Sequence, residues 1–101
     1  MGGAPSRQRF GDAQRRTVHY SGRVQGVGFR FTADRIASRF EVAGYVKNLD
    51  DGRVLIVVEG EPKELDRFLA GIQAEMAGYI RSVAVEPAEA TGEFSGFGVR
   101  Y

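Results

Sequence analysis

The stretch GRVQGVGFRF, residues 22–31, combines three glycines with two arginines. Apolar and polar residues alternate before this stretch, and apolar residues follow helical spacing after it, so we expect a glycine-rich loop that leads into a helix. The first N–H groups of such a helix have no acceptor within it and attract anions. Gly26 and Gly28 permit unusual backbone angles, and Arg30 adds a planar, permanent positive charge that matches phosphate oxygens. The predicted phosphate-binding loop is Gln25, Gly26, Val27, Gly28, Phe29 and Arg30.

Taken alone, a Gly-x-Gly loop with a nearby arginine is more often a tight turn followed by a surface arginine. A functional interpretation therefore depends on the elements around the loop. From Thr17, the apolar residues Val18, Tyr20 and Val24 alternate with polar ones, which is the period of a half-buried strand. A helix is expected next, with an apolar face made of Phe29, Ala33, Ile36, Ala37 and Phe40.

Two stretches rich in β-branched and aromatic residues follow, separated by Asp-Asp-Gly, which predicts an antiparallel hairpin. Pro62 suits the first position of a second helix, whose apolar stripe is Leu65, Phe68, Leu69, Ile72 and Met76. The elements expected after the first helix are strands over 42–49 and 53–60, a helix from Pro62 to Gly78, and strands over 79–86 and 97–101.

This order predicts an α+β, ferredoxin-like βαββαβ sandwich, in which an antiparallel sheet carries two helices on one face and a short extra C-terminal strand. In that topology the strands over 17–24 and 42–49 run in the same direction, with 53–60 between them. The loop over 25–30 and Asn48 should then emerge at the same end of the sheet.

Composition narrows the classes of function. The chain has 101 residues, a net charge of +1, no cysteine and a single histidine, His19. We expect one domain over residues 17–101 after a flexible tail over 1–16, whose four arginines would fit a nucleic-acid-binding arm less well than a solvated terminus. The charge gives no general field for nucleic acid or membranes, and no metal site is expected. We also expect a cytoplasmic monomer.

Several polar residues allow a structural explanation as readily as a functional one. Asn48 ends a strand beside a turn, where asparagine is common. Asp50 and Asp51 fit a hairpin turn better than a metal loop. Arg23 and Lys47 flank the proposed site and could add positive charge, although alternate strand residues face opposite ways.

The stretches GRVQGVGFR (22–30) and GYVKNLDDGRVLIVVEG (44–60) together closely resemble the two signatures of the acylphosphatases. The resemblance runs from about Val18 to the closing FGVRY, and the family is also ferredoxin-like. It implies that Arg30 binds phosphate and that Asn48 orients the attacking water. Family members vary at position 28, where this chain has glycine.

The resemblance implies hydrolysis of an acyl phosphate to a carboxylate and inorganic phosphate, by in-line attack of water and without a metal. Inorganic phosphate should be product and inhibitor. The alternative is a non-catalytic anion-sensing or protein-interaction module of the same fold. RNA binding is disfavoured, because the strand over 53–60 has no stacking aromatic residues. The sequence does not identify the cellular acyl phosphate.

Overall fold

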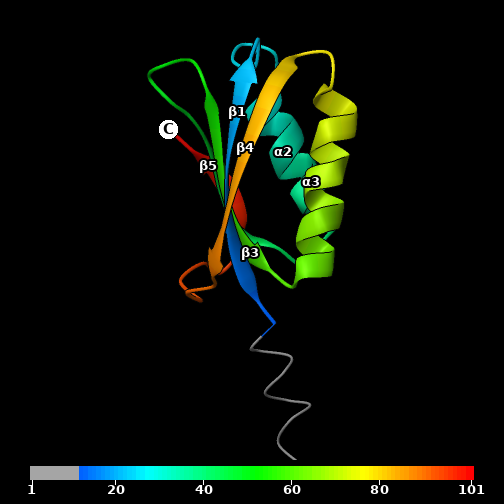
Figure 1. Ribbon diagram of the computed structural model, residues 1–101, viewed down its shortest axis with the longest axis vertical. Helices are drawn as coiled ribbons and strands as arrows, with labels where there is room; N and C mark the ends of the chain where they lie inside the picture. Colours follow the sequence, from blue (N-terminus) through cyan, green and yellow to red (C-terminus); the bar gives the residue numbers. More distant parts are fainter. Residues whose placement is uncertain (1–11) are drawn as a thin grey trace, which may run out of the picture.

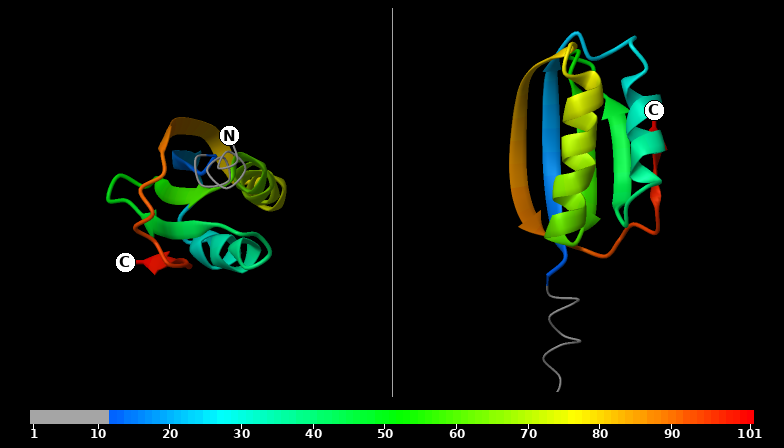
Figure 2. Two further views of the ribbon diagram at one scale, coloured as in Figure 1. Left: turned by 90° about the horizontal axis from the view of Figure 1, so that it is seen from below. Right: turned by 90° about the vertical axis from the view of Figure 1, so that its right-hand side faces the viewer.

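The computed structural model describes residues 12–101, which form a five-stranded sheet and two helices (Figure 1). Figure 2 shows that both helices cover the same face of the sheet. No helix of this part of the chain is long and apolar enough to cross a membrane. The elements are β1 (Gln14–Gly22), α2 (Phe29–Ala37), β2 (Ala43–Asn48), β3 (Val54–Gly60), α3 (Pro62–Met76), β4 (Ile80–Glu89) and β5 (Phe97–Arg100).

The strand order β4-β1-β3-β2-β5 confirms the predicted topology of the first four strands. β3 lies between β1 and β2 and is antiparallel to both, so β1 and β2 run the same way. The predicted short extra C-terminal strand is present as β5, and its direction, which was not predicted, is parallel to β2, so the complete sheet is mixed. β4 runs opposite to β1, so the chain leaves β4 at the end where β2 begins, and β5 then follows the direction of β2.

The core fills the space between the sheet and the helices. The helix faces that line it are the ones that the spacing of apolar residues predicts. Within α2, the buried residues are Phe29, Ala33, Ile36 and Ala37, whereas Phe40 lies beyond the helix and is partly buried against the core. Within α3, the buried residues are Leu65, Phe68, Ile72 and Met76. Pro62 begins α3 as expected. Burying such side chains is the main source of stability for a domain of this size.

β1 begins at Gln14 rather than Thr17, so the expected tail overlaps the strand. Arg15 and Arg16 pair in register with Glu59 and Val58 of β3. The side chain of Arg16 also forms an ion pair with Asp66 of α3. These contacts extend the strand, and they involve residues far apart in the sequence. The first part of the expected tail, residues 1–11, lies outside the described residues.

β4 continues past the predicted end at residue 86, through Pro87 to Glu89. Proline is tolerated in an edge strand, where one side of the backbone has no neighbouring strand, and β4 is at the edge of this sheet. The following loop crosses to β5, and its two ends are held differently. At the far end, Gly44 N–H donates to Gly96 O at 2.9 Å.

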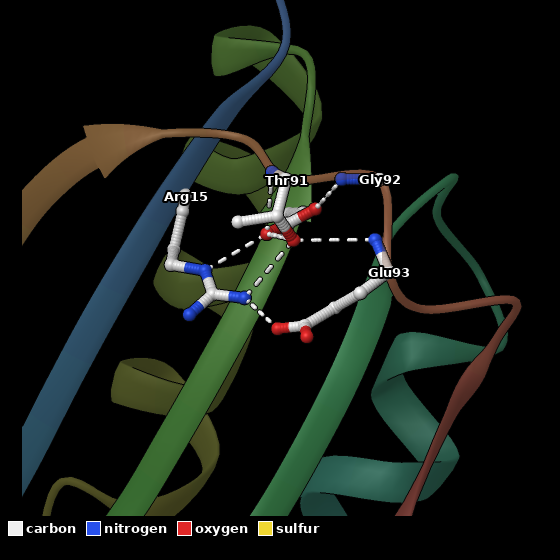
Figure 3. Close-up of polar contacts among 5 residues, drawn as sticks. Arg15, Thr91, Gly92 and Glu93 are labelled. Carbon is white, nitrogen blue, oxygen red and sulfur yellow. Dashed lines mark hydrogen bonds and ion pairs between the residues drawn. The ribbon is translucent and has the colours of Figure 1, made fainter.

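At the near end, the loop is anchored by the carboxylate of Glu59, which is only 6% exposed. Figure 3 shows the loop residues Thr91, Gly92 and Glu93 beside Arg15 of β1. Glu59 accepts hydrogen bonds from the backbone N–H groups of Thr91 and Gly92, both at 2.9 Å, and from the Thr91 hydroxyl at 2.8 Å. Arg15 Nε donates to the same carboxylate at 2.8 Å. The Arg15 guanidinium also reaches Glu93. We call these five residues the Glu59 cluster.

The hydrogen bonds of the Glu59 cluster decide the protonation state of its central carboxylate. Desolvation by itself would raise the pKa of Glu59, but the donors from Thr91, Gly92 and Arg15 outweigh it and lower the pKa to about 2. The hydrogen bonds from Arg15 to Glu59 and Glu93 correspondingly raise the pKa of Arg15. Glu59 is therefore ionised at neutral pH and fully supplied with donors.

Candidate active site

A pocket of about 270 Å³ opens at the end of the sheet where β1 leads into α2 and β2 ends. The β1–α2 loop and the end of β2 lie at the same end of the sheet, as the predicted topology requires (Figure 1). The lining of the pocket combines loop glycines, one cation, one carboxylate, one amide and several apolar or aromatic groups. The lining residues are Val24, Gly26, Gly28, Phe29, Arg30, Phe31, Asp34, Asn48, Val99 and Tyr101.

The loop backbone has the conformation for which its glycines are suited. Gly26 and Gly28 both have φ of 79°, in the left-handed region where a Cβ is strained. Gly28 is the N-cap of α2, and the Thr32 N–H donates to its carbonyl at 2.9 Å. The N–H groups of Phe29, Arg30 and Phe31 come before this first helical hydrogen bond and have no acceptor within the helix. The helix start thus presents free donors and a partial positive charge.

Two residues of the predicted loop support it instead of lining the pocket. The Gln25 amide donates to Leu49 O at 2.7 Å and to Arg53 O at 2.9 Å, which ties the loop to the β2–β3 turn. Val27 is partly buried against the core. These contacts fix the loop against the hairpin that carries Asn48.

Arg30 is half-buried and lines the pocket from the first turn of α2. It forms no ion pair with any carboxylate in residues 12–101. Its guanidinium carbon lies 4.7 Å from the centre of the Tyr101 ring, which is a cation–π distance. The donors of the guanidinium therefore remain available for an anion, while the ring restricts its position.

Asn48 lies where β2 ends, and alternation along the strand brings it to the pocket. Val46 is fully buried in the core, so Lys47 faces the opposite side of the sheet and Asn48 returns to the helix side. Lys47 and Arg23 do not line the pocket. Asp51 pairs with Arg53 within the hairpin turn, and this contact lowers the pKa of Asp51. The structure thus brings Arg30 and Asn48 together and separates Lys47, Arg23 and Asp51 from them.

Sequence reasoning did not assign five of the residues that line the pocket to the site: Val24, Phe31, Asp34, Val99 and Tyr101. Asp34 had a detectable signal, because it follows Arg30 by one helical turn and so shares its face. Val99 and Tyr101 gave none, since their position depends on the parallel pairing of β5 with β2. That pairing directs the C-terminal end of β5 towards the end of β2, beside Asn48.

The donor chemistry of the site is that of an anion-binding pocket. Arg30 and the N–H groups of the loop are all donors, and Asn48 has both a donor and an acceptor in its side chain. Asp34 is the acidic member of the lining. Across the described part of the chain, no group of three or more His, Cys, Asp and Glu is close enough to hold a metal ion.

A family model and several similar proteins identify one family. A family model for acylphosphatase matches residues 16–99. The chain is 45% identical over 73 residues to an acylphosphatase of Archaeoglobus fulgidus, covering 71% of this chain and 82% of that one. It is 39% identical to an acylphosphatase of Lactobacillus gasseri, over 84% of this chain and 96% of the relative. The crystal structure of the Bacillus subtilis acylphosphatase superposes with a TM-score of 0.79 at 30% identity, covering 87% of this chain and 99% of that one.

Proposed function

Because the chain belongs to the acylphosphatase family and has acylphosphatase activity, we propose that Arg30 and Asn48 are its catalytic residues and that the loop over 25–30 binds the substrate phosphate. The observation that carries this proposal is the single pocket shared by Arg30, the two left-handed glycines and Asn48. These residues come from two separate segments of the chain. Their meeting places donors for an anion beside the side-chain amide of Asn48.

Arg30 and the loop N–H groups hold the phosphoryl group. In phosphoryl transfer, negative charge is spread over the equatorial oxygens of the transition state. A guanidinium donates to two of these oxygens at once, and donors fixed in advance need no rearrangement as the charge develops. The stacked Tyr101 ring keeps Arg30 at the pocket.

Asn48 directs the attacking water. Its side-chain oxygen accepts a hydrogen bond from water, and its NH₂ group donates to the phosphate. An amide is too weak a base to take the proton, so the substrate phosphate receives it. The water oxygen bonds to phosphorus while the bond from phosphorus to the acyl oxygen breaks, and its electron pair leaves with the carboxylate.

The leaving group explains why so few residues suffice. A carboxylate is a weak base and leaves without protonation, so no general acid is needed. Arg30 and the helix N-terminus supply the positive charge that Mg²⁺ supplies in many phosphoryl-transfer enzymes, and we propose hydrolysis without a metal. Inorganic phosphate, the product, should compete for the same donors.

Hydrolysis of benzoyl phosphate, followed in the purified protein with and without exhaustive chelation, tests this mechanism. We expect turnover that chelation leaves unchanged and that inorganic phosphate inhibits competitively. Loss of turnover on chelation, with recovery on adding Mg²⁺, would contradict the metal-free mechanism. Phosphate binding without any turnover would favour a non-catalytic anion-binding module. The monomeric state and the cytoplasmic location stay predictions; sedimentation equilibrium tests the first.

A further inference from the structure

A second cavity, of about 320 Å³, lies outside the pocket that contains Arg30. It forms where β1 ends, α3 ends and β4 begins, and these segments meet at the same end of the molecule as the β1–α2 loop (Figures 1 and 2). Its lining residues are Gly22, Arg23, Gly78, Tyr79, Ile80 and Arg81. We call it the Arg23–Arg81 cavity.

The charges of the two cavities differ. The Arg23–Arg81 cavity is lined by two guanidinium groups and by no carboxylate, whereas Arg30 shares its pocket with Asp34. Within residues 12–101, neither Arg23 nor Arg81 forms an ion pair. Arginines that do pair with carboxylates in the same part of the chain are Arg15, Arg16, Arg35, Arg53 and Arg67. The two guanidinium groups therefore keep their donors available for an external anion.

The backbone beneath these two arginines is held in a specific arrangement. In the β1–β4 pairing, Ser21 lies opposite Ser82 and Gly22 opposite Ile80, so the register skips Arg81. Such a bulge redirects a side chain and is common beside functional sites. The Arg23 N–H donates to Tyr79 O at 2.9 Å and closes the strand end.

Gly22 makes this arrangement possible. Its φ is 130°, and a Cβ at this position would lie 2.4 Å from Tyr79 O and 2.7 Å from Arg81 N. Any other residue would push the start of β4 away, and Arg81 with it. The close approach of the strands thus brings two like charges to one cavity, although electrostatics alone would separate them.

The cavity and the active-site pocket are built on the same stretch of chain. Gly22 and Arg23 line the first, and Val24, Gly26 and Gly28 line the second. Adjacent Cα atoms are only about 3.8 Å apart, so the linings meet between Arg23 and Val24.

We propose that the Arg23–Arg81 cavity is a subsite for a second anionic group, a carboxylate or phosphate carried on the acyl part of the substrate. The enzyme then prefers acyl phosphates with such a group over uncharged acyl phosphates of the same size. This inference rests on the proposed function of the Arg30 pocket. It adds selection of the acyl part to a site that otherwise recognises only phosphate.

The test compares KM and kcat for benzoyl phosphate with those for its meta- and para-carboxylated forms, in the wild type and in Arg81→Ala. A carboxylate in these positions cannot reach the acyl carbon of its own molecule. We expect the wild type to favour at least one carboxylated substrate about three- to fivefold in KM, the range for an exposed charge pair, and Arg81→Ala to lose this preference. Arg81→Lys should retain part of it, and benzoyl phosphate hydrolysis should be unchanged in both variants.

Arg67→Ala is the matched control, because it removes one exposed arginine from α3 without touching either cavity. Its substrate preference should equal that of the wild type. The inference is overturned if the wild type shows no preference, or if the preference survives in Arg81→Ala.

Binding of the non-hydrolysable benzoylphosphonate and its carboxylated forms, measured by calorimetry, separates the two proposals. A carboxylate-dependent affinity that Arg81→Ala removes supports the subsite even if no substrate is hydrolysed, an outcome that would contradict the proposed function alone. Equal affinities of the wild type for all three ligands overturn the subsite, whether or not hydrolysis occurs.

Discussion

Arg15 and Arg30 lie near opposite ends of the sheet, and their surroundings differ in the same way as their roles. Arg15 is surrounded by acceptors in the Glu59 cluster, where the carboxylate and its donors are matched to each other. Arg30 has an aromatic ring beside it and, in the described chain, no ion-pair partner. The charge of Arg15 is neutralised by carboxylates of the fold, whereas the charge of Arg30 remains available to a ligand.

The difference also shows what each end contributes. Satisfied polar groups stabilise the position of a loop, whereas donors left without an acceptor cost stability unless water or a ligand binds them. The Glu59 cluster anchors the segment that leads into β5, and β5 brings Val99 and Tyr101 to the pocket. Substitutions at the Arg30 end should therefore change turnover, and substitutions at the Glu59 end should change stability.

The largest effect is expected from Arg30→Lys. Lysine keeps the charge but cannot reproduce the planar, two-point contact with phosphate oxygens, so kcat/KM for benzoyl phosphate should fall about a hundredfold or more. The melting temperature should stay near that of the wild type, because Arg30 forms no ion pair in residues 12–101. Arg35→Lys on the same helix, where Arg35 pairs with Glu75, is the control and should keep normal turnover. Near-normal activity of Arg30→Lys would remove Arg30 from the mechanism.

Asn48→Ala should come next, with a loss of kcat of about a hundredfold and little change in the inhibition constant of inorganic phosphate. The reason is that Asn48 is proposed to orient water, while Arg30 and the loop hold the anion. Steady-state kinetics with phosphate as inhibitor separate the two effects. If phosphate affinity fell as much as kcat, Asn48 would have to be assigned to anion binding instead.

At the other end, Glu59→Gln should lower the free energy of unfolding by about 2 kcal/mol and leave kcat within about a factor of two. The amide removes the charge that Arg15 faces and points its own donors at those of Thr91 and Gly92. Chemical denaturation with activity assays measures both quantities. Glu93→Gln is the control, because Glu93 is 55% exposed, and should cost less than about 1 kcal/mol. A large loss of turnover in folded Glu59→Gln would show that the two ends are not separable.

The same cluster predicts a pH dependence of stability. The pKa of Glu59 is lowered from its ordinary 4.5 to about 2 in the folded state, so the unfolded chain binds this proton first as the pH falls. The stabilisation is fully present above pH 4.5 and is lost progressively as the pH drops towards about 2. The difference in unfolding free energy between the wild type and Glu59→Gln should shrink over that window. A difference that is constant with pH would show that the carboxylate charge is not its source.

The smallest effect is expected at Tyr101, whose ring lies beside the Arg30 guanidinium. Tyr101→Ala removes the ring beside Arg30, and an exposed cation–π contact is worth about 0.5–1 kcal/mol, so kcat/KM should fall about two- to fivefold. Tyr101→Phe keeps the ring and should behave as the wild type. If the phenylalanine variant lost as much as the alanine variant, the hydroxyl and not the ring would position Arg30.

Much of this molecule follows from the sequence because it depends on local patterns. The apolar faces of α2 and α3, the start of α3 at Pro62 and the hairpin over 42–60 are set by periodicity and turn residues a few positions apart. The predicted βαββαβ topology placed the loop over 25–30 and Asn48 at the same end of the sheet, and the resemblance to the two signatures implied the roles of Arg30 and Asn48. Both line the same pocket.

Other features were decided only by the tertiary structure, because they join residues that no short pattern connects. The extension of β1 to Gln14 depends on partners in β3 and α3, and the parallel pairing of β5 depends on which end of the sheet β4 leaves. Tyr101 reaches Arg30 only through that pairing. Arg23 and Arg81 share a cavity because a bulge at Gly22 shifts the β4 register. A local pattern specifies which face of an element is apolar, but the partner of a charged side chain is chosen by the packing of distant segments.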